Sequence, residues 1–331
     1  MKVDTFFART FFATLFFAFT VVDLPAQTLK FQFGFEDSGT NTTDSVAGIV
    51  LNTVDASGNG ADFHGTNGSG VAGLGKALDF SSNPWQSPAA GPLASTVNNS
   101  SINFGTVSNF TTTLWLKPDS SLSVSNVFPR IFLLVPNGIT DLGPGDIAIV
   151  GNGQYFGANV DSIELQVNGG LVDCTNALPV GQWRFLGMTF DNAGKTLKLW
   201  SGSETNSISL VYQNTNFTTV PPNLGAAFSL FLGNRPSRSR SFDGRLDDVR
   251  FYTGTGDSNF VETVRKSVLV LQPKIIVSKS GTNILLTWPG GGTLQSATNA
   301  IGTYTNMTGA TSPFTVTNAS GARKFFRVKV Q

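Results

Sequence analysis

Residues 181–200 read GQWRFLGMTFDNAGKTLKLW and contain two apolar runs, 183–190 and 196–200, separated by the turn-forming cluster DNAG. Short runs rich in aromatic and aliphatic residues, bounded by Asn, Asp and Gly, are typical of β-strands joined by tight turns. Similar runs recur along the chain at residues 31–35, 112–116, 131–135, 162–167, 228–232 and 245–252. Because these runs do not alternate with helices, the sequence predicts an antiparallel β-sandwich or jelly roll.

The composition supports an almost entirely β fold. The 331 residues include 36 Gly, 15 Pro and 28 Phe, a mixture typical of many short strands that pack aromatic side chains and are joined by turns. The one predicted helix covers residues 258–266, SNFVETVRK, with Ser258 as its N-cap. A second, shorter series of strands begins at residue 273, so we expect one large domain over residues 28–268 and a small C-terminal β module over residues 273–331.

The first 26 residues predict export. Lys2 and Arg9 precede an apolar stretch at residues 11–22, and residues 24–26, LPA, end in a small residue before Gln27. This pattern is that of a signal peptide, and its apolar part is too short to span a membrane. We therefore expect a mature protein that is secreted, extracellular or bound to the cell surface, without a transmembrane segment.

Charge and cysteine content exclude some classes of function. Lys and Arg number 22 against 21 Asp and Glu, for a net charge of +1, so the chain has no general positive field that would attract nucleic acid. Cys174 is the only cysteine, which excludes an intrachain disulfide. Its setting, LVDCTNAL, predicts a small apolar strand residue rather than a reactive thiol.

Six segments within the first 268 residues occur in an order that, when they are taken together, is specific for one fold. They are residues 33–39 (FGFEDSG), 55–60 (DASGNG), 75–80 (GKALDF), 110–118 (FTTTLWLKP), 181–191 (GQWRFLGMTFD) and 242–252 (FDGRLDDVRFY). In this order they resemble the laminin-G-like, concanavalin A-like lectin/glucanase jelly-roll family of secreted bacterial proteins. The resemblance implies a two-sheet jelly roll, frequently a module that binds carbohydrate or protein, and often a structural calcium. Function varies widely on this fold.

The last 60 residues resemble a small β module found at the ends of multimodular secreted bacterial proteins. The residues that carry this resemblance are 293–296 (TLQS) and 324–328 (KFFRV). It implies no chemistry.

Two adjacent carboxylates lie in the strand run RLDDVRFY, residues 245–252. Strict alternation places Asp247 on the same face as Val249 and Phe251, and Asp248 on the face of Leu246, unless a bulge exchanges the two. A carboxylate on an apolar face is costly without a cation or several hydrogen-bond donors. The sequence therefore predicts a binding partner for one of these two residues.

The family resemblance implies a calcium ion as that partner. In the family, an early acid and a glycine-rich loop meet an acid of the last strand; on this chain these are Glu36, Asp55, Asn59 and Asp247 or Asp248. Backbone carbonyls would complete the roughly six to eight oxygens that calcium prefers. The alternative is that Asp55 forms an Asx-turn within DASGNG and that the strand acid pairs with Arg245 or Arg250.

The residues present do not favour catalysis. A glycosidase on this fold needs two carboxylates, and the clustered Glu-x-Asp-x-x-Glu strand of the family's hydrolases does not occur here. The four Glu residues are at least 40 positions apart, although pairs of Asp stay open. His64 is the only histidine, and no Gly-x-Ser-x-Gly elbow accompanies it. We expect a surface or turn histidine rather than a catalytic or metal-binding one.

Loop aromatics beside Asn or Asp are the candidates for binding sugar, because sugar rings stack on aromatic faces while amides and carboxylates bind the hydroxyls. Trp85 in SSNPWQSP, and Tyr155 and Phe156 in GNGQYFGANVD, have this setting. Trp115, Trp183 and Trp288 lie in strand runs and are expected in the core. The arginine-rich run 235–245, RPSRSRSFDGR, either meets an acidic glycan or is a solvated turn.

Three functions stay open. The first is a non-catalytic extracellular recognition module that binds carbohydrate or a protein partner, with a structural calcium site. The second is an envelope or adhesion protein that uses both β domains as spacers and has no soluble ligand. The third is a polysaccharide-active hydrolase with an Asp-based site.

Overall fold

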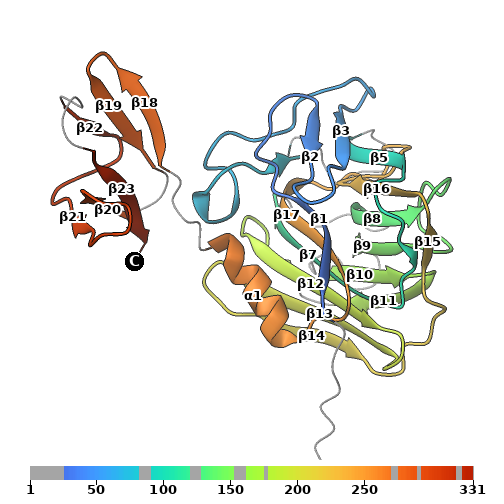
Figure 1. The fold of residues 1–331 in the computed structure, drawn as a ribbon. Coiled ribbons are helices and arrows are strands. Elements are labelled where there is room, and N and C mark those ends of the chain that lie inside the picture. The colour runs from blue at the N-terminus through green and yellow to red at the C-terminus, as the bar shows by residue number, and fades with distance from the viewer. Residues whose placement is uncertain are drawn as a thin grey trace, which may run out of the picture.

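The computed structural model describes residues 26–81, 91–119, 128–152, 162–174, 178–269, 275–288, 292–317 and 323–330. Over these residues the chain is almost entirely β, as predicted, with one α-helix, α1 (Ser258–Leu269), and one short 3-10 helix, η1 (Val71–Gly73). Two large antiparallel sheets form a jelly-roll sandwich (Figure 1). In this part of the chain, no helix has the length and apolar character needed to cross a membrane.

The first large sheet contains the two strands formed within residues 181–200. Its strand order is β1-β17-β7-β12-β13-β14, with β4 also paired to β17. The bounds are β1 (Thr28–Phe33), β4 (Leu78–Asp79), β7 (Asn109–Pro118), β12 (Arg184–Asp191), β13 (Thr196–Ser203), β14 (Ser209–Asn214) and β17 (Gly244–Thr253). Strands β12 and β13 pair from Asp191 and Thr196 outward, so the predicted strand–turn–strand unit is confirmed.

The second large sheet has the order β11-β10-β9-β8-β16-β5-β3-β2. The bounds are β2 (Asn41–Thr43), β3 (Val50–Val54), β5 (Leu93–Asn99), β8 (Arg130–Pro136), β9 (Ile147–Asn152), β10 (Ser162–Val167), β11 (Gly170–Cys174) and β16 (Phe228–Leu232). A short pair, β6 (Gly105–Thr106) and β15 (Asn223–Gly225), lies outside both sheets.

The main core lies between the two sheets and is built from the alternate residues that each strand turns inward. Phe251 of β17 lies at its centre, with ring centroids 5.6 Å from Phe31 and 5.7 Å from Phe110. Cys174 is 1% exposed within this core, and burial raises the pKa of its thiol to about 12. The prediction of a small apolar strand residue is therefore confirmed.

A second apolar cluster covers the outer face of the first sheet. Trp115, Phe185 and Tyr252 pack there against Val261 and Val264 of α1, and Figure 1 shows α1 lying along β13 and β14. Trp115 and Trp183 are buried, as predicted.

Helix α1 begins at Ser258, as predicted, but the capping residue is the one before it. The Oδ1 atom of Asp257 accepts a hydrogen bond from the Phe260 N–H at 2.8 Å. The prediction of Ser258 as the N-cap is wrong, because the carboxylate of Asp257, one position earlier, accepts the hydrogen bond from the first turn of the helix.

The C-terminal residues form two small three-stranded sheets. One has the order β18-β19-β22 and the other β21-β20-β23. The bounds are β18 (Ile276–Ser280), β19 (Asn283–Thr287), β20 (Gly292–Ala297), β21 (Thr305–Asn306), β22 (Phe314–Val316) and β23 (Phe325–Val330). Leu286, Trp288 and Leu294 form their common core. The predicted boundary near residues 271–273 lies outside the described residues.

One end of the sandwich gathers connections from both sheets, and we call it the loop end. There, β3, β9, β11 and β16 end while β5, β8 and β10 begin. The pairs Val54–Leu93, Arg130–Val150, Leu232–Phe132 and Ile163–Cys174 show this. The arginine-rich run crosses the same end, because it connects the last residue of β16 with the first of β17.

Candidate functional site

A β-bulge in β17 decides where the two adjacent carboxylates point. Asp247 pairs with Trp115 and Arg250 with Thr113, so three steps along β17 oppose two along β7. Asp248 has a φ of 45°, in the left-handed region that Asp tolerates better than most residues. The bulge turns Asp247 to the outer face of the sheet, beside Trp115. The prediction from strict alternation, which placed Asp247 with the core residues, is therefore wrong.

Asp247 is only 6% exposed and is held by backbone N–H groups. Its Oδ2 accepts from the N–H of Val71 at 3.0 Å, and its Oδ1 accepts from the N–H of Asp248 at 2.7 Å. Burial, followed by the negative charges of Asp248 and Glu36, raises the pKa of Asp247 well above that of an ordinary carboxyl group. Asp247 therefore ties the loop of η1 to the outer face of the first sheet.

Asp248 forms a buried ion pair. The Nε atom of Arg250 lies 2.9 Å from its Oδ1 and 2.8 Å from its Oδ2, and Gln32 donates to Oδ1 at 2.8 Å. Arg250 also donates to Ser267 Oγ of α1 at 2.9 Å. Burial raises the pKa of Asp248, and the attraction of Arg250 offsets this only in part. The alternative interpretation, in which the strand acid pairs with Arg250, is confirmed.

Glu36 shares a small cleft of about 170 Å³ with these two carboxylates. Its Oε1 accepts from the N–H of Lys76 at 3.2 Å. Gly75, at a φ of +54°, lies so close that a Cβ atom there would be 2.0 Å from the same oxygen. The cleft is also lined by Gln32, Gly34, Val71, Leu74, Arg250, Ser267 and Val268.

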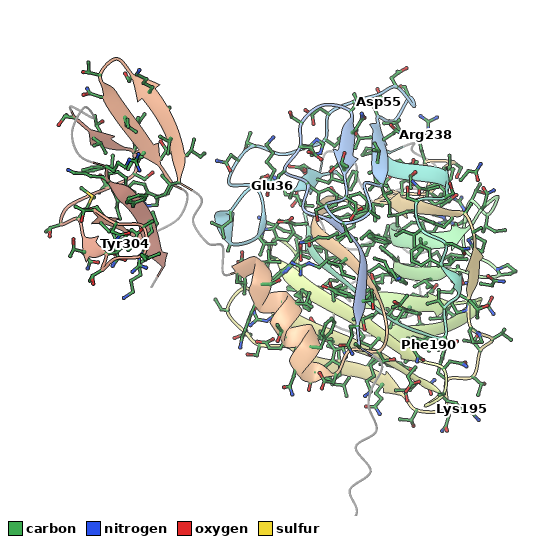
Figure 2. All side chains as sticks on the ribbon, viewed as in Figure 1. Glu36, Asp55, Phe190, Lys195, Arg238 and Tyr304 are labelled. Atoms are coloured by element: carbon green, nitrogen blue, oxygen red, sulfur yellow. The ribbon has the colours of Figure 1, made fainter. Side chains whose placement is uncertain are left out.

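The other two predicted calcium ligands lie elsewhere. Asp55 accepts from the N–H groups of Ser57 and Asn59 at 2.8 and 2.9 Å, which is the predicted Asx-turn. Figure 2 shows Asp55 beside Arg238 and apart from Glu36, and Arg238 Nη1 donates to the Ala56 carbonyl at 2.7 Å. The structure therefore brings Glu36, Asp247 and Asp248 together without Asp55 or Asn59.

These carboxylates do not fit a calcium ion. The described residues hold no group of three or more His, Cys, Asp or Glu side chains with the geometry of a metal site. Asp247 already accepts two N–H groups, and Arg250 supplies the positive charge that Asp248 needs. A calcium ion requires roughly six to eight oxygens that are free to coordinate it.

We expect the unfolding temperature to stay within about 1 °C when EDTA replaces calcium in the buffer, because a protein without a bound metal gains no linkage stabilisation from it. Differential scanning calorimetry measures this directly, in buffer that contains about 1 mM EDTA or about 1 mM CaCl₂. A rise of several degrees in calcium, with metal found by elemental analysis, would show that the five predicted ligands rearrange around an ion.

A larger cleft, of about 510 Å³, lies on the other side of the η1 loop. Small-molecule sites commonly occupy roughly 300–1,000 Å³. Polar side chains and a glycine-rich backbone predominate in its lining, which comprises Asp62, Phe63, His64, Gly65, Thr66, Asn67, Gly68, Ser69, Asp79 and Arg245. We call it the polar cleft.

Asp62 and His64 form one wall of the polar cleft. The Nδ1 atom of His64 lies 2.7 Å from Asp62 Oδ1, and Asp62 Oδ2 accepts from the N–H of Gly39 at 2.7 Å. The His64 side chain is only 1% exposed, and its Nε2 has no hydrogen-bond partner within the described residues. The prediction was a surface or turn histidine: His64 does lie in the connection between β3 and β4, but it is not a surface residue, because an isolated bridge with Leu78 draws it against β4.

An ion pair also lines the polar cleft. Arg245 Nε donates to Asp79 Oδ2 at 2.7 Å, and both side chains are about a quarter exposed. Register places the two residues directly opposite each other, on β17 and β4. Thr66 and Asn67, which also line it, are exposed. The cleft thus offers hydrogen-bond donors and acceptors at fixed positions.

A third site has carboxylates on the second sheet. Glu164 of β10 lies directly opposite Asp173 of β11. Glu164 is 2% exposed, and burial, followed by the charge of Asp173, raises its pKa to about 7. This pair was not predicted from the sequence, although a signal was present. The dipeptide Asn168-Gly169 predicts a two-residue hairpin turn, and counting back from that turn aligns the two acids.

The three aromatic residues predicted to bind sugar, Trp85, Tyr155 and Phe156, lie outside the described residues. The residues that flank them belong to the loop end. Gly91, which follows the segment of Trp85, donates its N–H to the carbonyl of Arg238 at 2.8 Å, and Gly151, which precedes the segment of Tyr155, donates to Pro129 at 2.9 Å.

Comparison with solved structures gives similar folds at low identity. Domain 4 of AbnA, an extracellular GH43 arabinanase of Geobacillus stearothermophilus, in complex with arabinotriose, is 18% identical, with a TM-score of 0.47 over 72% of this chain and 98% of that one. A GH54 α-L-arabinofuranosidase is 12% identical, with a TM-score of 0.49 over 76% of this chain, and is covered over only 60% of its own length. CBM40 of the Ruminococcus gnavus IT-sialidase, bound to α2,3-sialyllactose, is 14% identical, with a TM-score of 0.36 over 51% of this chain and 97% of that one.

No curated protein matches the sequence of this chain. A family match does exist for residues 93–256, which run from β5 almost to α1 and include most strands of both large sheets. The two sheets, their antiparallel order and the core between them agree with that match. Residues 93–256 of this chain match the family model of the concanavalin A-like lectin/glucanases superfamily.

Proposed function

We propose that this protein is a secreted or cell-surface recognition protein that binds carbohydrate without cleaving it. The observation that carries the proposal is the polar cleft of about 510 Å³ beside β4 and β17. A sugar presents many hydroxyl groups around a small ring, and it is bound by several convergent donors and acceptors in a cleft of this size. The superfamily of residues 93–256 supports the choice of a sugar as ligand.

The lining of the polar cleft suits hydroxyl groups. The Asp62 and Asp79 carboxylates accept hydrogen bonds, the Arg245 guanidinium donates them, and the exposed Thr66 and Asn67 do both. Asp62 and Asp79 are already held in place by His64 and Arg245, so a ligand would meet groups that lose little freedom on binding. The calcium ion implied by the family resemblance is not needed for this arrangement.

Export is part of the proposal and rests on residues 1–26, which have the pattern of a signal peptide. Secretion would place the polar cleft where extracellular glycans or glycoproteins are found. The small C-terminal β module would then connect or anchor the binding domain.

A hydrolase is the second candidate, and one observation favours it. Glu164, with a pKa of about 7, lies opposite Asp173, and glycosidases use a carboxyl group with a raised pKa beside a second carboxylate. Against it, Glu164 is 2% exposed, and a general acid must reach the oxygen of the scissile bond. We therefore prefer binding without cleavage.

The test is a binding survey of the purified chain against neutral and acidic polysaccharides, by affinity electrophoresis and calorimetry. Asn67→Trp places a large side chain at the mouth of the polar cleft and is expected to weaken binding at least tenfold, or by about 1.4 kcal/mol. Asn206→Trp is the matched control, because Asn206 is equally exposed on the turn between β13 and β14. Trp85→Ala and Tyr155→Ala test the aromatic residues predicted from sequence.

Each outcome separates the candidates. Saturable binding that Asn67→Trp weakens and Asn206→Trp preserves supports recognition at the polar cleft. No binding to any polysaccharide would leave the spacer function that the sequence also allows. Release of reducing ends, lost in Glu164→Gln, would establish the hydrolase instead.

A further inference from the structure

The small C-terminal β module carries charge of one sign, which the balanced net charge of the whole chain conceals. Residues 273–331 contain six Lys and Arg and no Asp or Glu, whereas residues 1–272 contain 16 Lys and Arg and 21 Asp and Glu. The six basic residues are Lys274, Lys279, Arg323, Lys324, Arg327 and Lys329. A strong difference in charge between two parts of a chain points to a partner of opposite charge for one of them.

Two of the basic residues lie on one face of the sheet β21-β20-β23. Strand register places Arg327 opposite Gln295, which in turn lies opposite Asn306. In the next row of the same face, Lys329 lies opposite Thr293. Because directly opposed residues point to the same face of a sheet, these five side chains form one surface, which we call the basic face. The other face of the sheet packs into the core of the module.

Arg327 is held in place on the basic face by uncharged groups. Its guanidinium carbon lies 4.3 Å from the ring centroid of Tyr304, and its Nε donates to Gln295 Oε1 at 2.7 Å. Gln295 is only 6% exposed and is fixed in turn, because its Nε2 donates to Asn306 Oδ1 at 2.6 Å. Among the described residues, only the Nε donor of Arg327 is used. The two terminal nitrogens are therefore oriented and available for a planar anion such as a carboxylate, or for a sulfate.

The positive charges of the module are not neutralised by carboxylates. Its five described basic residues are exposed, and none of them forms an ion pair with another described residue. Arg245 of the polar cleft, by contrast, is already paired with Asp79. An anion that approaches the basic face therefore does not have to displace a carboxylate before it binds.

We propose that the basic face is a second binding site, which binds the carboxylate or sulfate groups of an acidic polysaccharide. Arg327 binds one acid group through its two terminal nitrogens. Lys329, two residues along β23 and so roughly 6.5–7 Å away, binds the next acid group along the polymer. The Asn306 amide and the Thr293 hydroxyl supply donors and acceptors for sugar hydroxyls.

The composition of the basic face favours a polysaccharide over other polyanions. All five side chains are polar or charged, whereas a protein surface that binds a lipid bilayer also buries apolar side chains among the lipids. None of the five is aromatic, whereas sheet surfaces that bind single-stranded nucleic acid present rings on which bases stack. The site goes beyond the proposed function, because the polar cleft is built from residues 62–69, Asp79 and Arg245.

The experiment measures binding of the purified full chain to two acidic polysaccharides, polygalacturonate and dextran sulfate, with dextran as the neutral counterpart. The double variant Arg327→Gln/Lys329→Gln is expected to lose at least about tenfold in affinity for both acidic polymers, and its affinity should depend less on salt concentration. Arg327→Lys keeps the charge but not the planar fork, so a smaller loss is expected. Tyr304→Leu keeps every charge but removes the ring that orients Arg327, and a loss of about two- to fivefold is expected.

The matched control is Lys195→Gln/Lys266→Gln, which removes two exposed positive charges from the large domain and should bind acidic polymers like the wild type. Asn67→Trp, which obstructs the polar cleft, should also leave acidic binding unchanged. Far-ultraviolet circular dichroism and the unfolding temperature establish that each variant is folded. Vesicles of phosphatidylcholine and phosphatidylglycerol, and a single-stranded DNA oligonucleotide, are tested in parallel.

Acidic binding that is lost in the double variant and kept in the matched control supports the proposal. Acidic binding that is equal in all variants, or lost only in Asn67→Trp, overturns it, and so does the absence of binding to both acidic polymers. Tighter binding to the vesicles or to the DNA, lost in the double variant, would assign the basic face to lipid or to nucleic acid instead. Binding of neutral polysaccharides at the polar cleft is unaffected by any of these results, so the proposed function is judged separately.

Discussion

Replacing Asp248 with alanine is expected to lower the free energy of unfolding by about 3–5 kcal/mol, the typical cost of leaving one partner of a buried ion pair without the other. Arg250 is only 12% exposed at its side chain, so water cannot replace the carboxylate. Alanine also tolerates the φ of 45° at this position less well than Asp does. Urea denaturation at pH 7 measures the loss.

Two further variants separate charge from backbone strain. Asp248→Asn keeps the left-handed backbone and an acceptor for Gln32, so its cost should be clearly smaller than that of alanine. In Asp248→Ala/Arg250→Ala the remaining charge is gone, and the double variant should be less destabilised than the sum of the two single variants. Additive losses would contradict the ion pair as the source of the effect.

At pH 8, Glu164→Gln is expected to have a free energy of unfolding about 3 kcal/mol higher than that of the wild type, whereas at pH 4 the two should be equal. The reason is that folding raises the pKa of Glu164 from its ordinary value to about 7. A folded-state pKa above the unfolded one means that the folded protein binds the proton more tightly. The stability this contributes is fully present below about pH 4.5 and is lost as the pH rises to about 7. Glutamine does not titrate and keeps it.

The measurement is the free energy of unfolding of both proteins in urea between pH 4 and 8. The two curves should meet at low pH and separate as the pH rises. Asp173→Asn removes the negative charge that, after burial, contributes most to the raised pKa of Glu164. The pKa of Glu164 should therefore be lower in this variant, and its free energy of unfolding should fall less between pH 4 and 8 than that of the wild type. Parallel curves for Glu164→Gln and the wild type would show that Glu164 has an ordinary pKa.

Much of the fold could be predicted from local pattern. Alternation of apolar residues identified the strands, since strands with one buried face show this period. Residues 183–190 and 196–200 became β12 and β13, with ends that differ by at most three residues. Phe31, Phe33 and Phe35 are 0–1% exposed, as their spacing predicts. The Asx-turn of Asp55 also follows from sequence, because a side chain that bonds its own backbone needs no distant partner.

The candidate sites could be predicted only in part. The alignment of Glu164 with Asp173 follows from a two-residue turn, but the raised pKa depends on the burial of Glu164, which the sequence does not state. The polar cleft joins the 62–69 loop to Arg245, which lies far along the chain. Asp141 joins Arg130 to Arg235, which also lies far along the chain, in the same way.

The sequence by itself determined the class of fold, the positions of most strands and the local turns, because each depends on residues a few positions apart. Only the tertiary structure decided which face Asp247 occupies, that His64 is buried, and that Asp55 does not meet Glu36. The bulge at Asp248 shows the physical reason: it is set by the pairing of β17 with β7, where Asp247 lies opposite Trp115 and Arg250 opposite Thr113. The residues of β17 alone do not say which side chain such a bulge turns to the opposite face.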